Sequence, residues 1–128
     1  INVADEVRTV IDFRRMQQVM INLVLNAVHA MDGRGRLTIR AENDYERREV
    51  CIAISDTGEG IAADKIDKIF DPFYTTKQVG KGTGLGLSVS HGIIENHGGR
   101  IQVESREGEG TTFYIFLPMP ENEDENGS

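Results

Sequence analysis

The sequence has one cysteine, three prolines, few aromatic residues and no long apolar run. Because Cys51 is alone, the chain cannot form an internal disulfide or a metal site from clustered cysteines. Cys51 lies in an apolar alternating segment, which predicts a buried structural thiol. No apolar run approaches the roughly 18 residues of a membrane span, and no segment resembles a signal peptide. We therefore expect a cytoplasmic domain without direct membrane contact, even if its parent protein is membrane-anchored.

Basic residues are also scarce, with 14 Lys and Arg against 21 Asp and Glu, for a net charge of −7. The segment after Pro120 carries four acidic residues and no basic one, which leaves −3 for the rest of the chain. An acidic body argues against nucleic acid as a partner. At 128 residues the chain is long enough for one domain with a core. We expect a folded domain over residues 1–118 and an acidic, disordered tail over 119–128.

The first periodic segment predicts a long helix that is capped by Asp12, runs to about Met31 and stops at Gly33. Its core face is predicted to consist of Phe13, Met16, Met20, Leu23, Ala27 and Met31. The later segments predict a hairpin of strands Leu37–Glu42 and Glu49–Asp56, a short helix near Asp64–Ile69, a loop over 71–83, a helix Leu85–Asn96 capped by Gly98 and Gly99, and strands Arg100–Ser105 and Thr111–Leu117. This order predicts an α+β two-layer sandwich, with helices on one face of a mixed, mostly antiparallel sheet.

The first candidate site residue is Asp56, which ends an apolar strand and opens Asp56-Thr57-Gly58-Glu59-Gly60. Asp56 has the same strand parity as Val50, Ile52 and Ile54, so it should face the helical layer. A carboxylate there needs a donor, and the exocyclic amine of adenine is one candidate. A cap or turn carboxylate is the alternative. The segment also matches G-x-G-x-x-A, but the parallel βαβ unit required for dinucleotide binding does not follow.

A second glycine cluster, Gly82-Thr83-Gly84-Leu85-Gly86, leads into a predicted helix. Glycine there costs roughly 1 kcal/mol per residue relative to alanine. Close backbone approach to phosphates at a helix N-terminus, or the mobility of a closing lid, would explain that cost. A flexible surface loop is the alternative. The cluster does not match the P-loop pattern.

A polar row interrupts the apolar first helix, because Gln18, Asn22, Asn26 and His29 follow one another at spacings of four, four and three. Asparagine is expensive to bury without a partner, so this row suggests the wall of a pocket. Its amide oxygen is a hard ligand that suits Mg²⁺. A buried hydrogen-bond network between helices is the alternative.

Four motifs stand in order, and together they resemble the ATP-binding catalytic domain of two-component sensor histidine kinases. They are Asn22-Leu23-x-x-Asn26-Ala27, Asp56-x-Gly58-x-Gly60, Phe70-Asp71-Pro72-Phe73-Tyr74-Thr75-Thr76-Lys77 and Gly82-Thr83-Gly84-Leu85-Gly86-Leu87. The resemblance extends from about Val10 to Pro118, and the Phe-rich form is similar to the nitrogen-regulatory branch. It implies the Bergerat ATP-binding fold, which type II topoisomerases, mismatch-repair clamps and a heat-shock chaperone share.

By this resemblance Asp56 accepts a hydrogen bond from adenine, Asn26 binds Mg²⁺ and Asn22 lines the phosphates. Residues Gly82 to Gly86 form the lid, whose position Phe70 and Phe73 tie to the body. Asn22, Asn26 and Lys77 are the implied catalytic residues, and Lys77 is also a candidate phosphate contact. The implied contacts to Mg²⁺-ATP are Asn22, Asn26, His29, Asp56, Gly58, Gly60, Ile61, Phe70, Phe73, Thr76, Lys77, Gly82, Thr83, Gly84, Leu85, Gly86, Leu87 and Thr112.

The chain departs from the family pattern in two places. Many members have a lysine and then an aromatic residue where this chain has His29 and Ala30. We expect His29 to replace part of the lysine's phosphate contact and no aromatic ring to stack on adenine from position 30. Members also have a helix and a strand before the first motif. Residues 1–11 leave little room for both, so we expect a missing sheet edge or a trimmed start.

The family's phosphoacceptor histidine lies in a separate dimerisation module and usually precedes an acidic residue. None of His29, His91 and His97 does so, and the last two are predicted to be helix-surface or C-terminal cap residues. The implied partner is therefore a histidine module of the same parent protein, with a response regulator acting downstream and the isolated domain monomeric. The alternatives are a nucleotide-sensing binding module and a clamp-type ATPase. The clamp usually needs a glutamate at position 22, which is Asn here.

Overall fold

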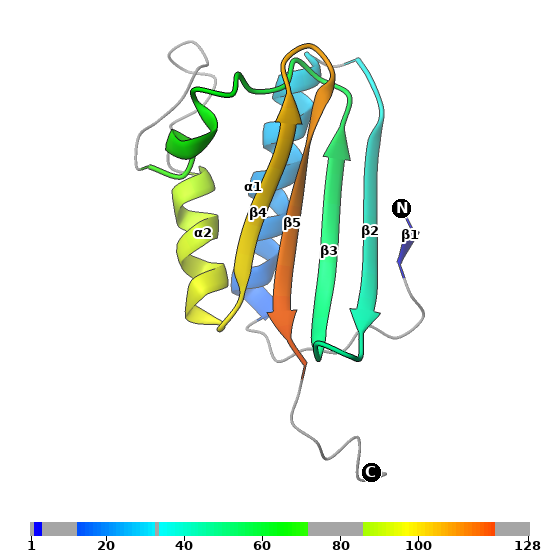
Figure 1. Ribbon diagram of the computed structural model, residues 1–128, viewed down its shortest axis with the longest axis vertical. Coiled ribbons are helices and arrows are strands. Elements are labelled where there is room, and N and C mark those ends of the chain that lie inside the picture. Colours follow the sequence, from blue (N-terminus) through cyan, green and yellow to red (C-terminus); the bar gives the residue numbers. More distant parts are fainter. Residues whose placement is uncertain (1, 4–12, 33, 72–85, 120–128) are drawn as a thin grey trace, which may run out of the picture.

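The computed structural model describes residues 2–3, 13–32, 34–71 and 86–119. Two helices lie on one face of a five-stranded sheet, with strand order β1-β2-β3-β5-β4 (Figure 1). The helices are α1 (Phe13–Met31) and α2 (Gly86–Asn96). The strands are β1 (Asn2–Val3), β2 (Leu37–Asp44), β3 (Glu49–Asp56), β4 (Arg100–Arg106) and β5 (Gly110–Pro118). β1 pairs with β2 in parallel and all other neighbours are antiparallel, which confirms the predicted α+β sandwich with a mostly antiparallel sheet.

The sheet edge next to β2 is formed by β1, where Asn2 pairs with Arg40 and Val3 with Ala41. A two-residue strand therefore occupies the edge for which the sequence left little chain. Among the helices in the described part of the chain, none is both long and apolar enough to cross a bilayer.

The core lies between the sheet and α1, because apolar side chains recur on one face of that helix. Met16, Leu23 and Ala27 are buried as predicted, and Met20 packs against the core. Val19 is also fully buried, although the predicted row omitted it. The predicted cap Asp12 lies outside the described residues, as does the side chain of Phe13. The sheet contributes the alternate residues Val50 and Ile54 of β3 and Phe113, Ile115 and Leu117 of β5.

The described part of the connection after β3, residues 57–71, contains less helix than expected. The predicted short helix near Asp64–Ile69 is only a 3₁₀ turn over Ile66–Lys68. Its hydrogen bonds span three residues, as in Lys68 N–H to the Lys65 carbonyl at 2.9 Å and Asp71 N–H to the Lys68 carbonyl at 3.0 Å. Such bonds have poorer geometry than α-helical ones and rarely extend further.

The end of α2 confirms the predicted glycine cap. Gly98 has φ +78° and donates its N–H to the Glu95 carbonyl at 2.9 Å, while Gly99 donates to the Ile94 carbonyl at 3.0 Å. This pair of bonds is the Schellman motif, which requires a left-handed residue. His97 Nδ1 lies 2.8 Å from the Ile93 carbonyl, so His97 is part of the cap, and His91 lies on the helix surface 3.4 Å from Glu95.

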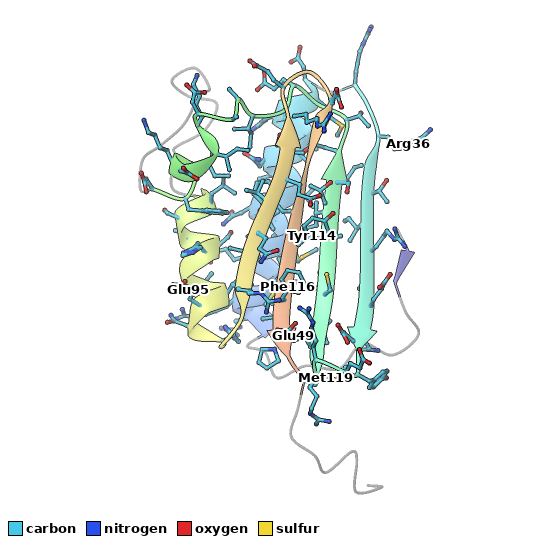
Figure 2. All side chains as sticks on the ribbon, in the orientation of Figure 1. Arg36, Glu49, Glu95, Tyr114, Phe116 and Met119 are labelled. Carbon is cyan, nitrogen blue, oxygen red and sulfur yellow. The ribbon has the colours of Figure 1, made fainter. Side chains whose placement is uncertain are left out.

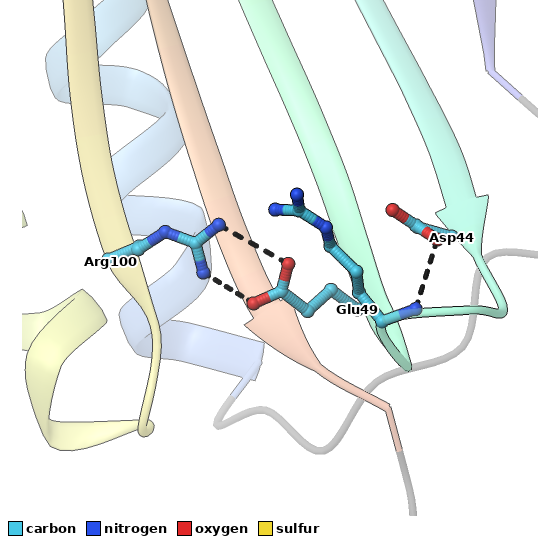
Figure 3. Close-up of polar contacts among 4 residues, drawn as sticks. Asp44, Glu49 and Arg100 are labelled. Carbon is cyan, nitrogen blue, oxygen red and sulfur yellow. Dashed lines mark hydrogen bonds and ion pairs between the residues drawn. The ribbon is translucent and has the colours of Figure 1, made fainter.

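The outer face of the sheet carries a network of paired side chains instead of helices. Figure 2 shows Tyr114 and Phe116 on this near face, and their rings stack with centroids 6.4 Å apart. The Arg100 guanidinium lies 4.1 Å from the centre of the Phe116 ring and forms an ion pair with Glu49 (Figure 3). Charge pairing and cation–π contact thus hold β3, β4 and β5 together on the face away from α1.

Candidate functional site

The end of β3 places a carboxylate on the helix-facing side of the sheet. Asp56 is only 7% exposed, and its partner across the β3–β5 ladder is Thr111. Gly58 donates its backbone N–H to Asp56 Oδ1 at 2.8 Å. Asp56 therefore has the turn role that was one of its two interpretations. A carboxylate has about four acceptor positions, so this turn bond is compatible with a second role towards a ligand.

The loop after Asp56 is held by the turn between β4 and β5, and we call residues 57–61 with residues 105–110 the loop–turn clamp. Gly108 N–H donates to the Glu59 carbonyl at 2.6 Å, and Ile61 N–H donates to Ser105 Oγ at 2.8 Å. Gly60 has φ +74°, and a Cβ there would lie 2.0 Å from the Arg106 carbonyl oxygen. The Gly58-x-Gly60 pattern thus reflects close backbone contact.

Two hydroxyl groups lead from the clamp to Thr111, the cross-strand neighbour of Asp56. Ser105 Oγ donates to the Gly110 carbonyl at 2.9 Å and accepts from Ile61 N–H, so its single proton is used. In its 2.7 Å contact with Thr111 Oγ1 it must therefore be the acceptor. The Thr111 hydroxyl therefore donates its proton to Ser105. Toward any other group that lies near Asp56, its oxygen can act only as a hydrogen-bond acceptor.

The same loop reaches the end of α1. Glu59 N–H donates to the Ala30 carbonyl at 3.1 Å, and a Cβ on Gly58 would lie 2.6 Å from that carbonyl. Thr57 Oγ1 accepts a bond from Arg36 N–H at 3.0 Å. Because Asn26 lies one turn before Ala30, these contacts place the carboxylate loop beside the C-terminal part of the polar row on α1. The end of α1 and the end of β3 both lie at the top of Figure 1.

The two helices meet at Asn22. Its Nδ2 donates to Ser90 Oγ at 3.3 Å, and Ser90 is fully buried on α2. This bond is part of the interhelical network that was the alternative interpretation of the asparagine row. Asn26 differs, because within the described residues its half-buried side chain has no hydrogen bond. Gly86, the last glycine of the second cluster, begins α2 one turn before Ser90.

Phe70 lies where the chain leaves the clamp for α2. Its ring centre is 5.1 Å from that of His91 and 6.3 Å from that of Phe113, in an edge-on arrangement. Phe70 thus contacts both a helix and the sheet. Leu87 and Ile61 also pack against the core, and His29 is exposed in the last turn of α1.

The structure separates Thr112 from the other predicted contacts. Thr112 bonds Ser55 at 2.9 Å on the outer face of the sheet, whereas Asp56 and Thr111 face the helices. Alternation along β5 explains this, since Thr111 shares its parity with Phe113, Ile115 and Leu117. Seven predicted contacts lie outside the described residues, namely Phe73, Thr76, Lys77, Gly82, Thr83, Gly84 and Leu85.

From the sequence we did not identify three polar residues that form hydrogen bonds at the candidate site, namely Thr111, Ser105 and Ser90. Strand parity could have identified Thr111. Ser90 follows Leu87 by three residues and precedes Ile94 by four, so it is a polar residue in an apolar helical row. Ser105 gave no comparable signal, because its partners come from distant loops.

The donor set suits a nucleotide better than a metal alone. A buried carboxylate beside backbone amides can read a base edge, and an amide oxygen such as that of Asn26 can contribute one hard ligand. No group of three or more His, Cys, Asp or Glu side chains capable of holding a metal occurs among the described residues. A divalent cation here would depend mainly on phosphate oxygens. Fold and site together define a nucleotide-binding α+β sandwich.

Comparison with known proteins identifies the class more closely. The profile described as "Histidine kinase-, DNA gyrase B-, and HSP90-like ATPase" matches residues 11–121, so the chain belongs to this family. Sensor histidine kinase ZraS of Escherichia coli (strain K12) is 49% identical over 105 residues, which are 82% of this chain and 22% of ZraS. Sensor kinase CckA of Brucella abortus (strain 2308) is 48% identical over 84% of this chain and 13% of CckA. The chain thus spans less than a quarter of these relatives.

Solved structures agree with this assignment. The catalytic domain of histidine kinase ThkA matches with a TM-score of 0.78 and 40% identity, over 91% of this chain and 77% of that one. Full-length ShkA, solved in complex with AMPPNP, matches with a TM-score of 0.79 and 26% identity, over 94% of this chain and 26% of ShkA. The fold is therefore that of histidine kinase catalytic domains.

Proposed function

We propose that this domain binds Mg²⁺-ATP and donates the γ-phosphate to a histidine on a separate phosphoacceptor module in two-component signalling. The observation that carries the proposal is the meeting of the Asp56 loop with the asparagine helix, through the contacts of Gly58 and Glu59 with Ala30. A base-reading carboxylate and phosphate-facing amides thereby share one end of a fold that sensor histidine kinases use.

At the base end, Asp56 would accept the hydrogen bond of the adenine amine. Gly58 N–H holds the carboxylate in place at 2.8 Å, so its position is set before a ligand arrives. The loop–turn clamp keeps this loop against the sheet. Thr111, whose proton points to Ser105, presents an acceptor beside the carboxylate. ShkA, solved with AMPPNP, supports an adenine nucleotide as the ligand class.

At the phosphate end, Asn26 would hold the Mg²⁺ ion and Asn22 would contact phosphate oxygens. The bound cation neutralises charge that develops on the phosphate oxygens. The hydrogen bond to Ser90 orients the Asn22 amide. The half-buried Asn26 amide forms no hydrogen bond with any described residue. His29, three residues after Asn26 on the same helix, is exposed and can approach the same phosphate oxygens.

Phosphoryl transfer requires position and charge neutralisation more than covalent help from the protein. The imidazole nitrogen of the acceptor forms the N–P bond while the bond from the γ-phosphorus to the bridging oxygen breaks, and ADP leaves with that oxygen. The acceptor is itself the nucleophile, so the domain needs no strong general base. Asn22 is a poor base for activating water, and we expect slow hydrolysis.

The deciding experiment mixes this domain with the phosphoacceptor module of its parent protein and γ-labelled ATP. Label on the module histidine, with little free phosphate from the domain alone, is the expected result. Nucleotide-dependent docking without label would instead indicate a sensing module. Rapid steady-state phosphate release by the domain alone would indicate a clamp-type ATPase, and either result would overturn the proposal.

The metal assignment has a separate test in Asn26→Asp. The substitution keeps the shape of the side chain but adds a negative charge and removes the amide N–H donors, so we expect the Mg²⁺ dependence of nucleotide binding to shift and transfer to fall. Asn96→Asp, at the exposed end of α2, adds the same charge away from the site and is the matched control. If Asn26→Asp leaves both Mg²⁺-ATP affinity and transfer unchanged, Asn26 does not hold the metal.

A further inference from the structure

A row of apolar side chains on α1 faces solvent. Ile21 is 55% exposed, Leu25 50% and Val28 39%, and their spacing of four and three places them on one face of the helix. We call these three residues the apolar ridge. Among the described residues only Tyr45 and Val89 are other large apolar side chains with comparable exposure. Single exposed residues are ordinary, whereas an aligned row on one helix points to a partner.

The ridge borders the asparagine row. Leu25 follows Asn22 by three residues and precedes His29 by four, so these side chains are neighbours on the helix surface. The buried side of α1, with Val19 and Leu23, faces the sheet. An element that covers the ridge therefore lies along the row of amides that faces the phosphates.

The shape and charge of the surface select the kind of partner. A straight ridge at helical spacing fits the groove of another helix. Arg14 lies on the same face, seven residues before Ile21, and α1 contains no Asp or Glu although the whole chain has a net charge of −7. The complementary surface is an amphipathic helix that offers apolar residues flanked by acidic ones.

We propose that the apolar ridge is the docking surface for an amphipathic helix of the phosphoacceptor module, an inference that rests on the proposed function. The acceptor must approach the edge that Asn22 and Asn26 define, and the ridge is the exposed apolar surface adjoining that edge on α1. The matched relatives ZraS and CckA extend far beyond the part this chain spans, so such a helix has room elsewhere in the parent protein. Docking there would bring the module's histidine alongside the γ-phosphate.

The test compares wild type with the double variant Ile21→Gln, Leu25→Gln, because glutamine preserves helix propensity. Phosphotransfer to the parent module is measured over a range of module concentrations. Loss of each half-exposed apolar side chain should raise the KM for the module roughly 3- to 10-fold, so the double variant should raise it roughly tenfold to hundredfold. The KM for ATP and the melting temperature should not change. Tyr45, in the turn between β2 and β3, is 71% exposed, so Tyr45→Gln is the matched control and should leave both KM values and the melting temperature unchanged.

The other outcomes separate failure of the docking proposal from failure of the proposed function. If wild type transfers phosphate and the double variant has the same KM for the module, the docking surface lies elsewhere while the proposed function stands. If wild type transfers none, the proposed function fails and the inference falls with it. A wild-type dimer in sedimentation analysis that the double variant loses would show that a second copy covers the ridge. If the double variant melts lower, Leu25→Gln alone should still raise the KM for the module by roughly 3- to 10-fold, and an unchanged value would overturn the proposal.

Discussion

Gly60 and Gly108 form a natural pair for testing the loop–turn clamp. Both have left-handed backbones, with φ +74° and φ +83°. A Cβ on Gly60 would lie 2.0 Å from the Arg106 carbonyl oxygen, whereas one on Gly108 would meet nothing within 4 Å. The alanine variants therefore share the conformational cost and differ only in the space available. Their comparison isolates the close approach between the loop and the turn.

The expected difference between the two variants follows from the bonds that must lengthen. A left-handed alanine costs about 1–2 kcal/mol in either variant. In Gly60→Ala the loop must also move away from Arg106, which strains the Gly108–Glu59 bond of 2.6 Å and the Ile61–Ser105 bond of 2.8 Å. At about 1 kcal/mol per hydrogen bond, Gly60→Ala should lose roughly 2 kcal/mol more than Gly108→Ala.

Chemical denaturation gives the two free energies of unfolding, and titration with a non-hydrolysable ATP analogue gives the affinity. Because the displaced loop carries the Gly58 N–H that holds Asp56, Gly60→Ala should also weaken the analogue at least about tenfold. Gly108→Ala should bind it like wild type. Equal stabilities for the two variants, or wild-type affinity in Gly60→Ala, would refute the idea that close contact in the clamp positions the carboxylate.

Three further predictions concern single side chains. Thr111→Val should weaken adenine-nucleotide binding severalfold while Thr112→Val does not, and calorimetric titration giving the reverse would contradict the assignment of the two strand faces. Ser90→Ala should weaken nucleotide binding through Asn22, so a double-mutant cycle with Asn22→Ala should be non-additive, and additive losses would show that the bond between them is not functional. Burial, and secondarily Glu42, raises the pKa of the Cys51 thiol, so alkylation near pH 8 should be slower in the folded than in the unfolded chain. Because the folded state keeps this proton to higher pH, part of the free energy of unfolding should be lost above the thiol's ordinary pKa of 9.0, and Cys51→Ala should lack that part.

The sequence was most informative where one periodicity decides the answer. The alternation of Val50, Ile52 and Ile54 placed Asp56 on the helix-facing side, and the structure confirms it. The two helices agree with the periodic segments, and four strands agree to within two residues. The same alternation places Thr111 on the helix-facing side of β5 and Thr112 on the outer side, a distinction that was missed because strand parity was not applied to β5.

The rest depended on contacts between distant parts of the chain. The Asn22–Ser90 bond joins residues 68 apart, and nothing local to either residue indicates its partner. The pairing of β1 with β2 likewise depends on a contact between the chain start and residues 40–41. Gly60 and Gly110 were recognisable as glycines in turns, but the carbonyls they approach, those of Arg106 and Asp56, are set only by the assembled sheet.

The division of the candidate site residues between the sheet and the helices has a consequence for how such a site can diversify. Asp56, Thr111 and the clamp belong to the sheet and its turns, whereas Asn22, Asn26 and Ser90 belong to the helices. Under the proposed function, substitutions in the strand-end turns would change which base is preferred without altering the helical layer that would contact the phosphates and the acceptor. Ligand choice and transfer rate would then be separately tunable properties, coupled mainly where Gly58 and Glu59 contact Ala30.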